Sequence, residues 1–118
     1  MHIILGDDDL QQIEKKYTVL EVDQVRFDPD DLPVQAYCVM ENIPVSEMSE
    51  LEQFINLHSK LMENYRKRDW NFCEQALGHL QGRWGGQVDT FYAEIANRIA
   101  KYKDEDPGEN WDPAIQKY

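Results

Sequence analysis

The chain has 118 residues, which suits one domain with a single core and leaves no room for a separate catalytic domain. It carries 12 lysines and arginines against 23 aspartates and glutamates, a formal net charge of -11. This charge repels phosphate backbones and anionic lipid, so we expect neither nucleic acid nor a membrane as a partner. The short apolar start, followed at once by aspartates, lacks the pattern of a signal peptide, and we expect a cytoplasmic protein.

A short strand and a short helix are expected at the start of the chain. The apolar residues 2–5 are followed by Gly6, which suits a strand that ends in a turn. The aspartates at 7–9 complement the positive end of a helix dipole, and Leu10 and Ile13 follow at helical spacing. The pattern therefore predicts one short helix after the first strand.

Two β-prone segments predict a hairpin. Residues 17–27 alternate in polarity, but their apolar side chains fall in two registers, which indicates a bulge or two partly covered faces. Residues 28–33 contain three aspartates and two prolines, which form turns and do not continue a sheet ladder. Residues 34–40 are again apolar and β-prone, so the loop of the hairpin is longer than a tight turn.

Apolar spacing predicts three helices after the hairpin. Ser49 and Glu52 have the spacing of a capping box, and Asp69 and Asp89 are placed to cap the second and third helices. Side chains that recur every three or four residues give the first helix an apolar face, made of Leu51, Phe54, Ile55, His58, Leu61, Met62 and Tyr65. The inward faces expected for the next two helices are Trp70, Cys73, Leu77 and Leu80, and then Tyr92, Ile95, Ile99 and Tyr102.

These elements predict a single α+β domain over residues 1–118. A β-hairpin subdomain (1–43), with its short strand and helix, is expected to pack on a three-helix, tetratricopeptide-like part (44–104), because neither is stable alone at this size. An extended acidic tail (105–118) follows. Trp111 is its largest apolar side chain, and we expect it to dock on the helices.

Two groups of short motifs stand out. The first is Val22-Asp23-Gln24-Val25-Arg26 with Pro33-Val34-Gln35-Ala36-Tyr37, and the second is Tyr65-Arg66-Lys67-Arg68-Asp69-Trp70 with Cys73, Asp89, Arg98 and Trp111-Asp112. Together they resemble the closing hairpin of class III nucleotide cyclase domains and the helical extension that often follows it in bacterial cyclases. The resemblance covers most of the chain, although each motif is short.

The chain departs from the cyclase pattern where chemistry is concerned. Residues 28–31 replace the glycine-lysine turn of the family, and Pro113 replaces its final glycine. The metal-binding aspartates, the base-recognising residues and the transition-state arginine of cyclases lie upstream of the region of resemblance and have no counterpart here. The resemblance therefore implies no catalytic residue, and we expect no enzymatic activity and no cofactor.

Other reactive side chains have simple structural interpretations. The aspartates at 7–9 and 28–31 lack the ligand pattern of an EF-hand, so solvated turns are expected there and no metal site. His58 lies on an apolar helix face and is expected to be buried and hydrogen-bonded, whereas His79 should face water. Two free buried thiols are expected rather than a disulfide or a zinc site at the two cysteines, Cys38 and Cys73.

The candidate partner-binding residues are a basic cluster and two tryptophans. Arg66, Lys67 and Arg68 can simply complement the negative end of their helix dipole, or they can bind an acidic peptide end. Trp84, which lies between glycines, is predicted to be an exposed anchor beside them. We expect the acidic tail with Trp111 to be drawn to the same basic residues and to cover their groove in part.

The sequence thus predicts a non-catalytic protein-interaction or scaffold module that is a monomer or a weak homodimer and has a protein or peptide partner. One alternative is a remnant nucleotide-binding or cyclase-regulating protein, which would follow from the cyclase-like hairpin. A second is an acidic mimic of nucleic acid, which rests on the net charge of -11 alone.

Overall fold

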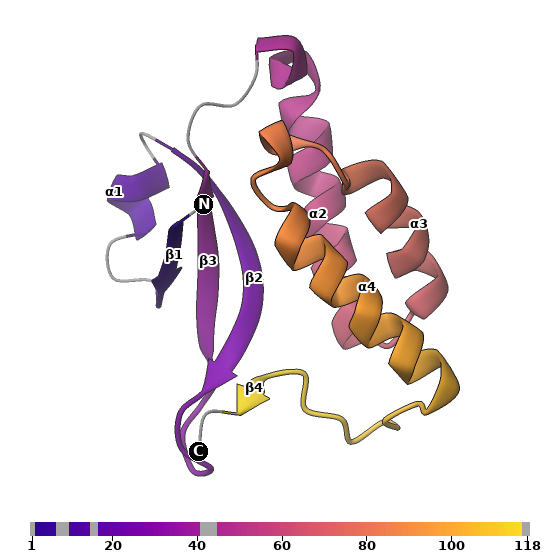
Figure 1. The fold of residues 1–118 in the computed structure, drawn as a ribbon. Helices are drawn as coiled ribbons and strands as arrows, with labels where there is room; N and C mark the ends of the chain where they lie inside the picture. The colour runs from indigo at the N-terminus through magenta and orange to yellow at the C-terminus, as the bar shows by residue number, and fades with distance from the viewer. Residues whose placement is uncertain (1, 7–9, 15–16, 41–44, 117–118) are drawn as a thin grey trace. The chain divides into compact units, whose positions relative to one another are not determined.

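The computed structural model describes residues 2–6, 10–14, 17–40 and 45–116 (Figure 1). It has the predicted α+β class, with a four-stranded mixed sheet and three main helices packed together. The chain forms two compact units, of which the first comprises Met1–Glu41 with Asp112–Tyr118 and the second Asn42–Trp111. The acidic tail is thus divided between the units after Trp111. In the described residues, no helix combines the length and apolarity needed to cross a membrane.

The sheet of the first unit confirms the predicted strand and hairpin and adds one strand. Its order is β1-β3-β2-β4, in which β1 and β2 run antiparallel to β3 and β4 runs parallel to β2. The expected short helix, α1, is also present, but the aspartates predicted at its start lie outside the described residues. The bounds are β1 His2–Leu5, α1 Leu10–Glu14, β2 Thr18–Arg26, β3 Val34–Met40 and β4 Ile115–Gln116.

A β-bulge explains the two apolar registers of β2. Glu21 pairs with Tyr37 and Gln24 pairs with Gln35, so β2 has one more residue than β3 over this stretch. The extra residue reverses the inside-outside alternation of the strand. Val22 and Val25, which an unbroken strand would place on opposite faces, are therefore both buried.

The side chain of Gln35 supports the bulge. Its amide nitrogen lies 2.9 Å from the carbonyl oxygen of Val22 and 3.3 Å from that of Asp23, and it also lies 2.9 Å from the carbonyl of Ala36. A bulge disrupts the ladder locally, and its carbonyls then need donors from elsewhere. Gln35 supplies them from the strand that pairs with the bulge.

We expect the substitution Gln35→Ala to lower the free energy of unfolding by about 1 kcal/mol, because half-buried carbonyls lose their donor. Urea denaturation followed by circular dichroism measures this change. Gln75→Ala, at an exposed position of the helical unit, is the matched control and should leave the midpoint nearly unchanged. Equal midpoints for the two variants would show that the bulge does not depend on Gln35.

The second unit consists of three helices that lie side by side (Figure 1). They are α2 Leu51–Arg66, α3 Trp70–Leu80 and α4 Asp89–Asp104, and two 3-10 turns, η1 Val45–Glu50 and η2 Trp84–Gly86, precede α2 and α4. Most of the side chains predicted to face inward are buried, and Ala76 and Val88 join them; Leu51, Ile55 and Tyr102 are only partly covered. Helical spacing therefore identified most of the buried faces of these three helices.

The predicted helix caps are right in one case of three. The Oδ1 atom of Asp69 accepts a hydrogen bond from the backbone N–H of Phe72 at 3.2 Å, which confirms the cap of α3. Asp89 instead accepts from the N–H of Gly82 at 2.8 Å, so it fastens the α3–α4 connection and does not cap α4. The capping box at Ser49 is also wrong, because η1 leads directly into α2 and no side chain caps that helix.

A buried chain of hydrogen bonds joins α2, η2 and α4. The indole Nε1 of Trp84 donates to the Oη atom of Tyr92 at 3.1 Å, and this oxygen lies 2.8 Å from Nδ1 of His58. An indole N–H can only donate, so Tyr92 accepts from Trp84 and its own proton can go to His58. His58 is buried and hydrogen-bonded as predicted, and His79 is exposed as predicted.

The prediction that Trp84 is an exposed anchor is wrong. Its side chain is only 1% exposed. Gly85 and Gly86 have positive φ angles, as does Trp84 itself, and this tight turn directs the indole into the core. There it contacts Phe54 edge-on, with ring centroids 6.4 Å apart. The glycines predicted an exposed turn, but the turn that they form directs the Trp84 ring into the core.

Both cysteines are free and buried, as predicted. Burial raises the pKa of the Cys38 thiol to about 11 and that of the Cys73 thiol to about 12, because a thiolate is poorly solvated inside the protein. The neighbouring Asp69 and Glu74 carboxylates raise the pKa of Cys73 further. Neither thiol is therefore set up as a nucleophile.

We expect Tyr92→Phe to lower the free energy of unfolding by about 1–3 kcal/mol, because it removes the acceptor of a buried indole N–H and a partner of a buried imidazole. Chemical denaturation monitored by tryptophan fluorescence tests this. Tyr17→Phe removes a hydroxyl from a side chain that is 42% exposed and serves as the control. If both variants unfold like the wild type, the hydrogen bonds among Trp84, Tyr92 and His58 do not stabilise the helical unit.

Candidate functional site

The turn between α2 and α3 holds Arg68 in a left-handed backbone conformation, with φ of 64°. The N–H of Arg68 donates to the carbonyl of Tyr65 at 3.2 Å, and the N–H of Asp69 donates to that of Asn64 at 2.9 Å. These two bonds form a Schellman motif, whose left-handed position glycine usually occupies. An L-residue there costs about 1–2 kcal/mol, so the side chain of Arg68 stands at a strained position.

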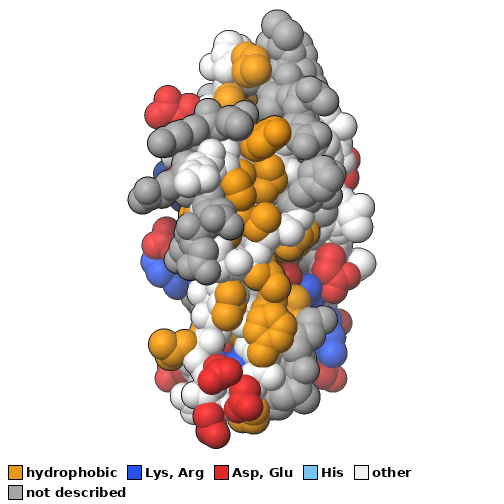
Figure 2. Space-filling model, turned by 90° about the vertical axis from the view of Figure 1, so that its left-hand side faces the viewer, with side chains coloured by type: hydrophobic (Ala, Val, Ile, Leu, Met, Phe, Trp, Pro, Cys, Tyr) orange, Lys and Arg blue, Asp and Glu red, His pale blue; other side chains and the backbone are white. Residues whose placement is uncertain are grey.

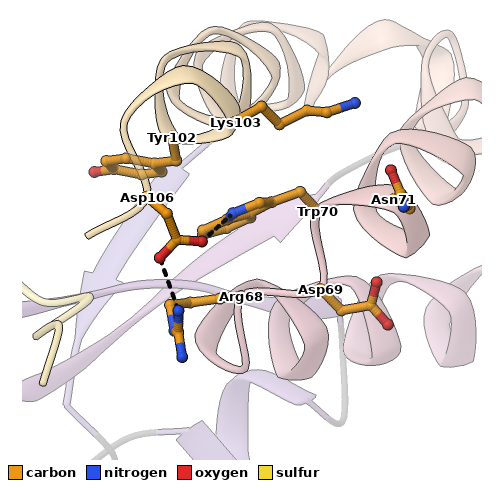
Figure 3. A pocket seen from close by; sticks show the side chains of 7 residues that line it. All are labelled: Arg68, Asp69, Trp70, Asn71, Tyr102, Lys103 and Asp106. Atoms are coloured by element: carbon orange, nitrogen blue, oxygen red, sulfur yellow. Dashed lines mark hydrogen bonds and ion pairs between the residues drawn. The ribbon is translucent and has the colours of Figure 1, made fainter. Parts of the chain in front are cut away.

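Arg68 opens onto a pocket at the ends of the helices (Figure 3). The pocket has a volume of about 280 Å³, and we call it the Arg68 pocket; it is lined by Arg68, Asp69, Trp70, Asn71, Tyr102, Lys103 and Asp106. Figure 3 shows the carboxylate of Asp106 between Arg68 and Trp70. Nη1 of Arg68 lies 2.7 Å from Oδ1, and Nε1 of Trp70 donates to Oδ2 at 3.3 Å. The pocket thus holds a carboxylate that the chain itself supplies.

The local hydrogen bonds favour the charged form of Asp106. The N–H of Gly108, then the Arg68 guanidinium and the Trp70 indole, lower the pKa of this carboxyl below its ordinary value of 3.8. Water still reaches the contact, since the side chains of Arg68 and Asp106 are 27% and 47% exposed. An ion pair in such a position stabilises a fold little.

A second ion pair borders the pocket. Nζ of Lys103, near the end of α4, lies 2.7 Å from Oε1 of Glu74 on α3. Each of these two pocket cations, Arg68 and Lys103, therefore has a carboxylate within contact distance. The arrangement provides anion-binding groups beside aromatic rings.

Three aromatic side chains beside the pocket receive Trp111. They come from the end of α2, the start of α3 and the end of α4, and we call Tyr65, Trp70 and Tyr102 the aromatic socket. The Trp111 ring centroid lies 5.1, 5.5 and 5.2 Å from theirs, with edge-on geometry in each case. Trp70 and Tyr102 are also stacked on each other at 5.4 Å. The predicted docking of Trp111 on the helices is confirmed.

The basic cluster does not act as one surface. Arg68 lines the pocket, whereas Lys67 pairs with Glu63 at 2.9 Å along its own helix and Arg66 does not line the pocket. Trp84 packs on Phe54 near the start of α2, roughly 20 Å along the helix from Arg68. The predicted groove joining the cluster to Trp84 is therefore wrong. The expected attraction of the acidic tail to the basic cluster is found at Arg68, through Asp106.

Sequence reasoning missed most of the other pocket residues. Tyr102 was predicted as an inward-facing residue of its helix, but nothing marked it as part of a site. Asn71 follows Arg68 by three residues but carries no sequence signal of its own, and Lys103 meets Arg68 only through the packing of α3 and α4. Asp106 begins an Asp-Pro-Gly turn, and this turn was the one local feature that set it apart from the other tail acids.

Two further features of the described residues are the acidic loop after β2 and the exposed hydrophobic side chains of the first unit. In the loop after β2, the N–H of Asp30 donates to Oδ1 of Asp28 at 3.0 Å, and Arg26 donates to the carbonyl of Asp31. The part of the chain that the structure describes holds no group of three potential metal ligands. Figure 2 shows hydrophobic side chains gathered in a band, and the exposed large hydrophobic side chains of the first unit are Ile3, Leu5, Tyr17, Phe27 and Leu32.

The tail is fastened again just after Trp111. Nε of Arg26 donates to Oδ2 of Asp112 at 3.1 Å, within the first unit. Oδ1 of Asp112 accepts from the N–H of Ala114 at 3.0 Å, and β4 follows, paired with the end of β2. The Asp112 contacts thus lead the tail into the sheet.

Comparison with known proteins gave no relative: no family model, no curated protein and no solved structure matches this chain. The resemblance to cyclases therefore stays a prediction. Residues that carry it do meet in the structure, Arg26 with Asp112 in the first unit and Trp111 with Tyr65 and Trp70 in the second.

The lowered pKa of Asp106 predicts when its contact is lost on acidification. A carboxyl with a lowered folded pKa contributes stability above its unfolded value of 3.8, and this is lost as the pH falls through the folded pKa. The Trp70 indole N–H resonance in NMR spectra should thus stay constant between about pH 8 and pH 5 and shift only below 3.8. Asp106→Asn should remove the acid transition and Asp104→Asn should keep it; a transition that survives Asp106→Asn would contradict this assignment.

Proposed function

We propose that this chain is a non-catalytic protein-interaction module whose helical unit binds an acidic segment of a partner protein at the Arg68 pocket. The observation that carries the proposal is the contact of Asp106 with both Arg68 and Trp70. A guanidinium and an indole N–H that bind one carboxylate bind another in the same position. The exposure of this ion pair lets a partner replace Asp106 without opening the core.

The backbone at Arg68 gives independent support. Glycine would form the same turn without strain but would bring no cation into the pocket. Buried apolar contacts do not explain the choice of arginine either, because the guanidinium lies at a water-accessible carboxylate. Strain held at a position whose side chain faces a pocket is typical of functional sites.

A nucleotide is the other ligand class that the pocket chemistry admits, since aromatic rings and cations also bind bases and phosphates. A triphosphate brings several negative charges where a peptide carboxylate brings one, so Asp69, which lines the pocket, and Glu74, which pairs with Lys103, oppose a nucleotide more strongly than a peptide. A thermal-shift titration with nucleoside triphosphates and Mg²⁺ separates the two classes. A nucleotide at a hundred times its Kd would add about 2.7 kcal/mol of stability.

We expect Arg68→Gly to weaken partner binding about tenfold or more, because hydrogen bonds to charged groups contribute about 1.5–3 kcal/mol. The same change should leave the free energy of unfolding unchanged or raise it, since it relieves the left-handed turn. Quantitative affinity purification from host extract with the full-length chain, followed by Kd measurement on the recovered partner, tests the first point. Chemical denaturation tests the second.

Lys67→Ala is the matched control, because it removes the same charge from the adjacent position without touching the pocket. Asp106→Ala should act in the opposite direction to Arg68→Gly and raise capture of the same partner. If Lys67→Ala and Arg68→Gly reduce capture equally, binding depends on net charge alone and the pocket is not the site. A saturable nucleotide shift without Arg68-dependent capture would replace the proposal with the nucleotide alternative.

A further inference from the structure

The stretch of residues 106–111, here called the tail segment, contacts the helical unit through its first and last side chains. Asp106 lies in the Arg68 pocket and Trp111 lies in the aromatic socket. Trp70 belongs to both, because its Nε1 donates to Asp106 and its ring packs against Trp111. The pocket and the socket therefore adjoin, and the tail segment occupies both at once.

The tail segment is shaped by its own hydrogen bonds. The N–H of Gly108 donates to Oδ1 of Asp106 at 2.8 Å, and the N–H of Trp111 donates to the carbonyl of Gly108 at 3.2 Å. Gly108 has φ of +86°, which a side chain at this position would oppose. The spacing of the two anchors is thus fixed within the segment, as in a peptide ligand that is ordered before it binds.

We propose that the Arg68 pocket and the aromatic socket form one two-point peptide-binding surface whose resident ligand is the tail segment. The partner then presents a carboxylate followed about five residues later by an aromatic side chain, as Asp106 and Trp111 do. This inference rests on the proposed function and names the chemistry of its partner. Trp111 is only partly buried and Asp106 is 47% exposed, so the tail segment can be exchanged for a partner segment.

A foreign peptide is a better occupant than the tail of a second copy. Each copy carries a net charge of -11, which opposes self-association. The tail of each copy is also tethered beside its own site, where its effective concentration is on the order of millimolar. The tail of a second copy has the same anchors as the resident tail, so it does not displace the tethered tail at protein concentrations below this value. A foreign peptide whose anchors bind more tightly can displace it.

The test uses the full-length chain with Asp106→Ala and Trp111→Ala together, which empties both anchor positions. The probe is a synthetic peptide of residues 104–113 with blocked ends, and isothermal titration calorimetry measures its Kd. We expect saturable binding to the double variant and binding at least tenfold weaker to the wild type, where the resident segment competes. The peptide with Asp106→Asn and the peptide with Trp111→Ala should each bind at least tenfold more weakly, and that with Glu109→Gln should bind equally well.

Trp111→Phe provides a second variant that keeps an aromatic ring in the socket, in case the double variant does not fold. It should bind the peptide with a Kd between those of the double variant and the wild type, an order that only competition produces. The inference is overturned if the folded variants do not bind the peptide, or if the Trp111→Ala peptide binds as well as the parent. A wild-type dimer in light scattering that Trp111→Ala converts to a monomer would make a second copy the occupant and would also overturn it.

The outcomes for the proposed function and for this inference are separable. If a partner is captured from extract in an Arg68-dependent way but the peptide does not bind, only the two-point inference is wrong. If the peptide binds and Arg68→Gly abolishes this binding, but no partner is captured from extract in an Arg68-dependent way, the proposed function is wrong and the two-point surface stands.

Discussion

The left-handed backbone of Arg68 is the constraint on which the helical unit and its site depend. It reverses the chain between α2 and α3 within three residues and pairs two carbonyls of the last turn of α2, those of Asn64 and Tyr65. The reversal brings the rings of Tyr65 and Trp70 to 6.0 Å, which builds two walls of the aromatic socket. It also directs the Arg68 guanidinium to the pocket, so one strained residue fixes both the hairpin and the cation.

The two ends of the helical unit are held by interactions of opposite character. At one end, Trp84, Tyr92 and His58 form a buried chain of hydrogen bonds, in which the indole N–H of Trp84 depends on the hydroxyl of Tyr92 as its acceptor. At the other end, the ion pair of Arg68 and Asp106 is exposed to water, and it contributes little to the stability of the fold. The first arrangement specifies how α2 and α4 pack. The second is the contact that we propose a partner exchanges.

The tail serves both units through neighbouring residues. Trp111 packs into the aromatic socket of the helical unit, whereas Asp112 bonds to Arg26 and begins the approach to β4 in the sheet unit. Tail residues before Trp111 therefore act on the helices, and those after it extend the sheet. Release of the tail segment would change the pocket and the socket. The contact of Arg26 is with Asp112, which lies outside the tail segment.

The sequence by itself determined the features that local rules control. Spacings of three and four residues identified the buried faces of α2, α3 and α4, and the double register of β2 allowed a bulge as one of two interpretations, because both patterns lie within single elements. Asp69 as a helix cap and two free buried thiols followed from equally local cues. The tertiary structure decided that Trp84 is buried, that Asp89 bonds to Gly82, and which side chains of the basic cluster and the acidic tail pair, namely Arg68 with Asp106, 38 residues away. The contacts of Trp84 with Phe54 and of Arg68 with Asp106 depend on which distant segments meet in space, and the contact of Asp89 with Gly82 depends on the path of the α3–α4 connection. Neither periodicity nor composition encodes these choices.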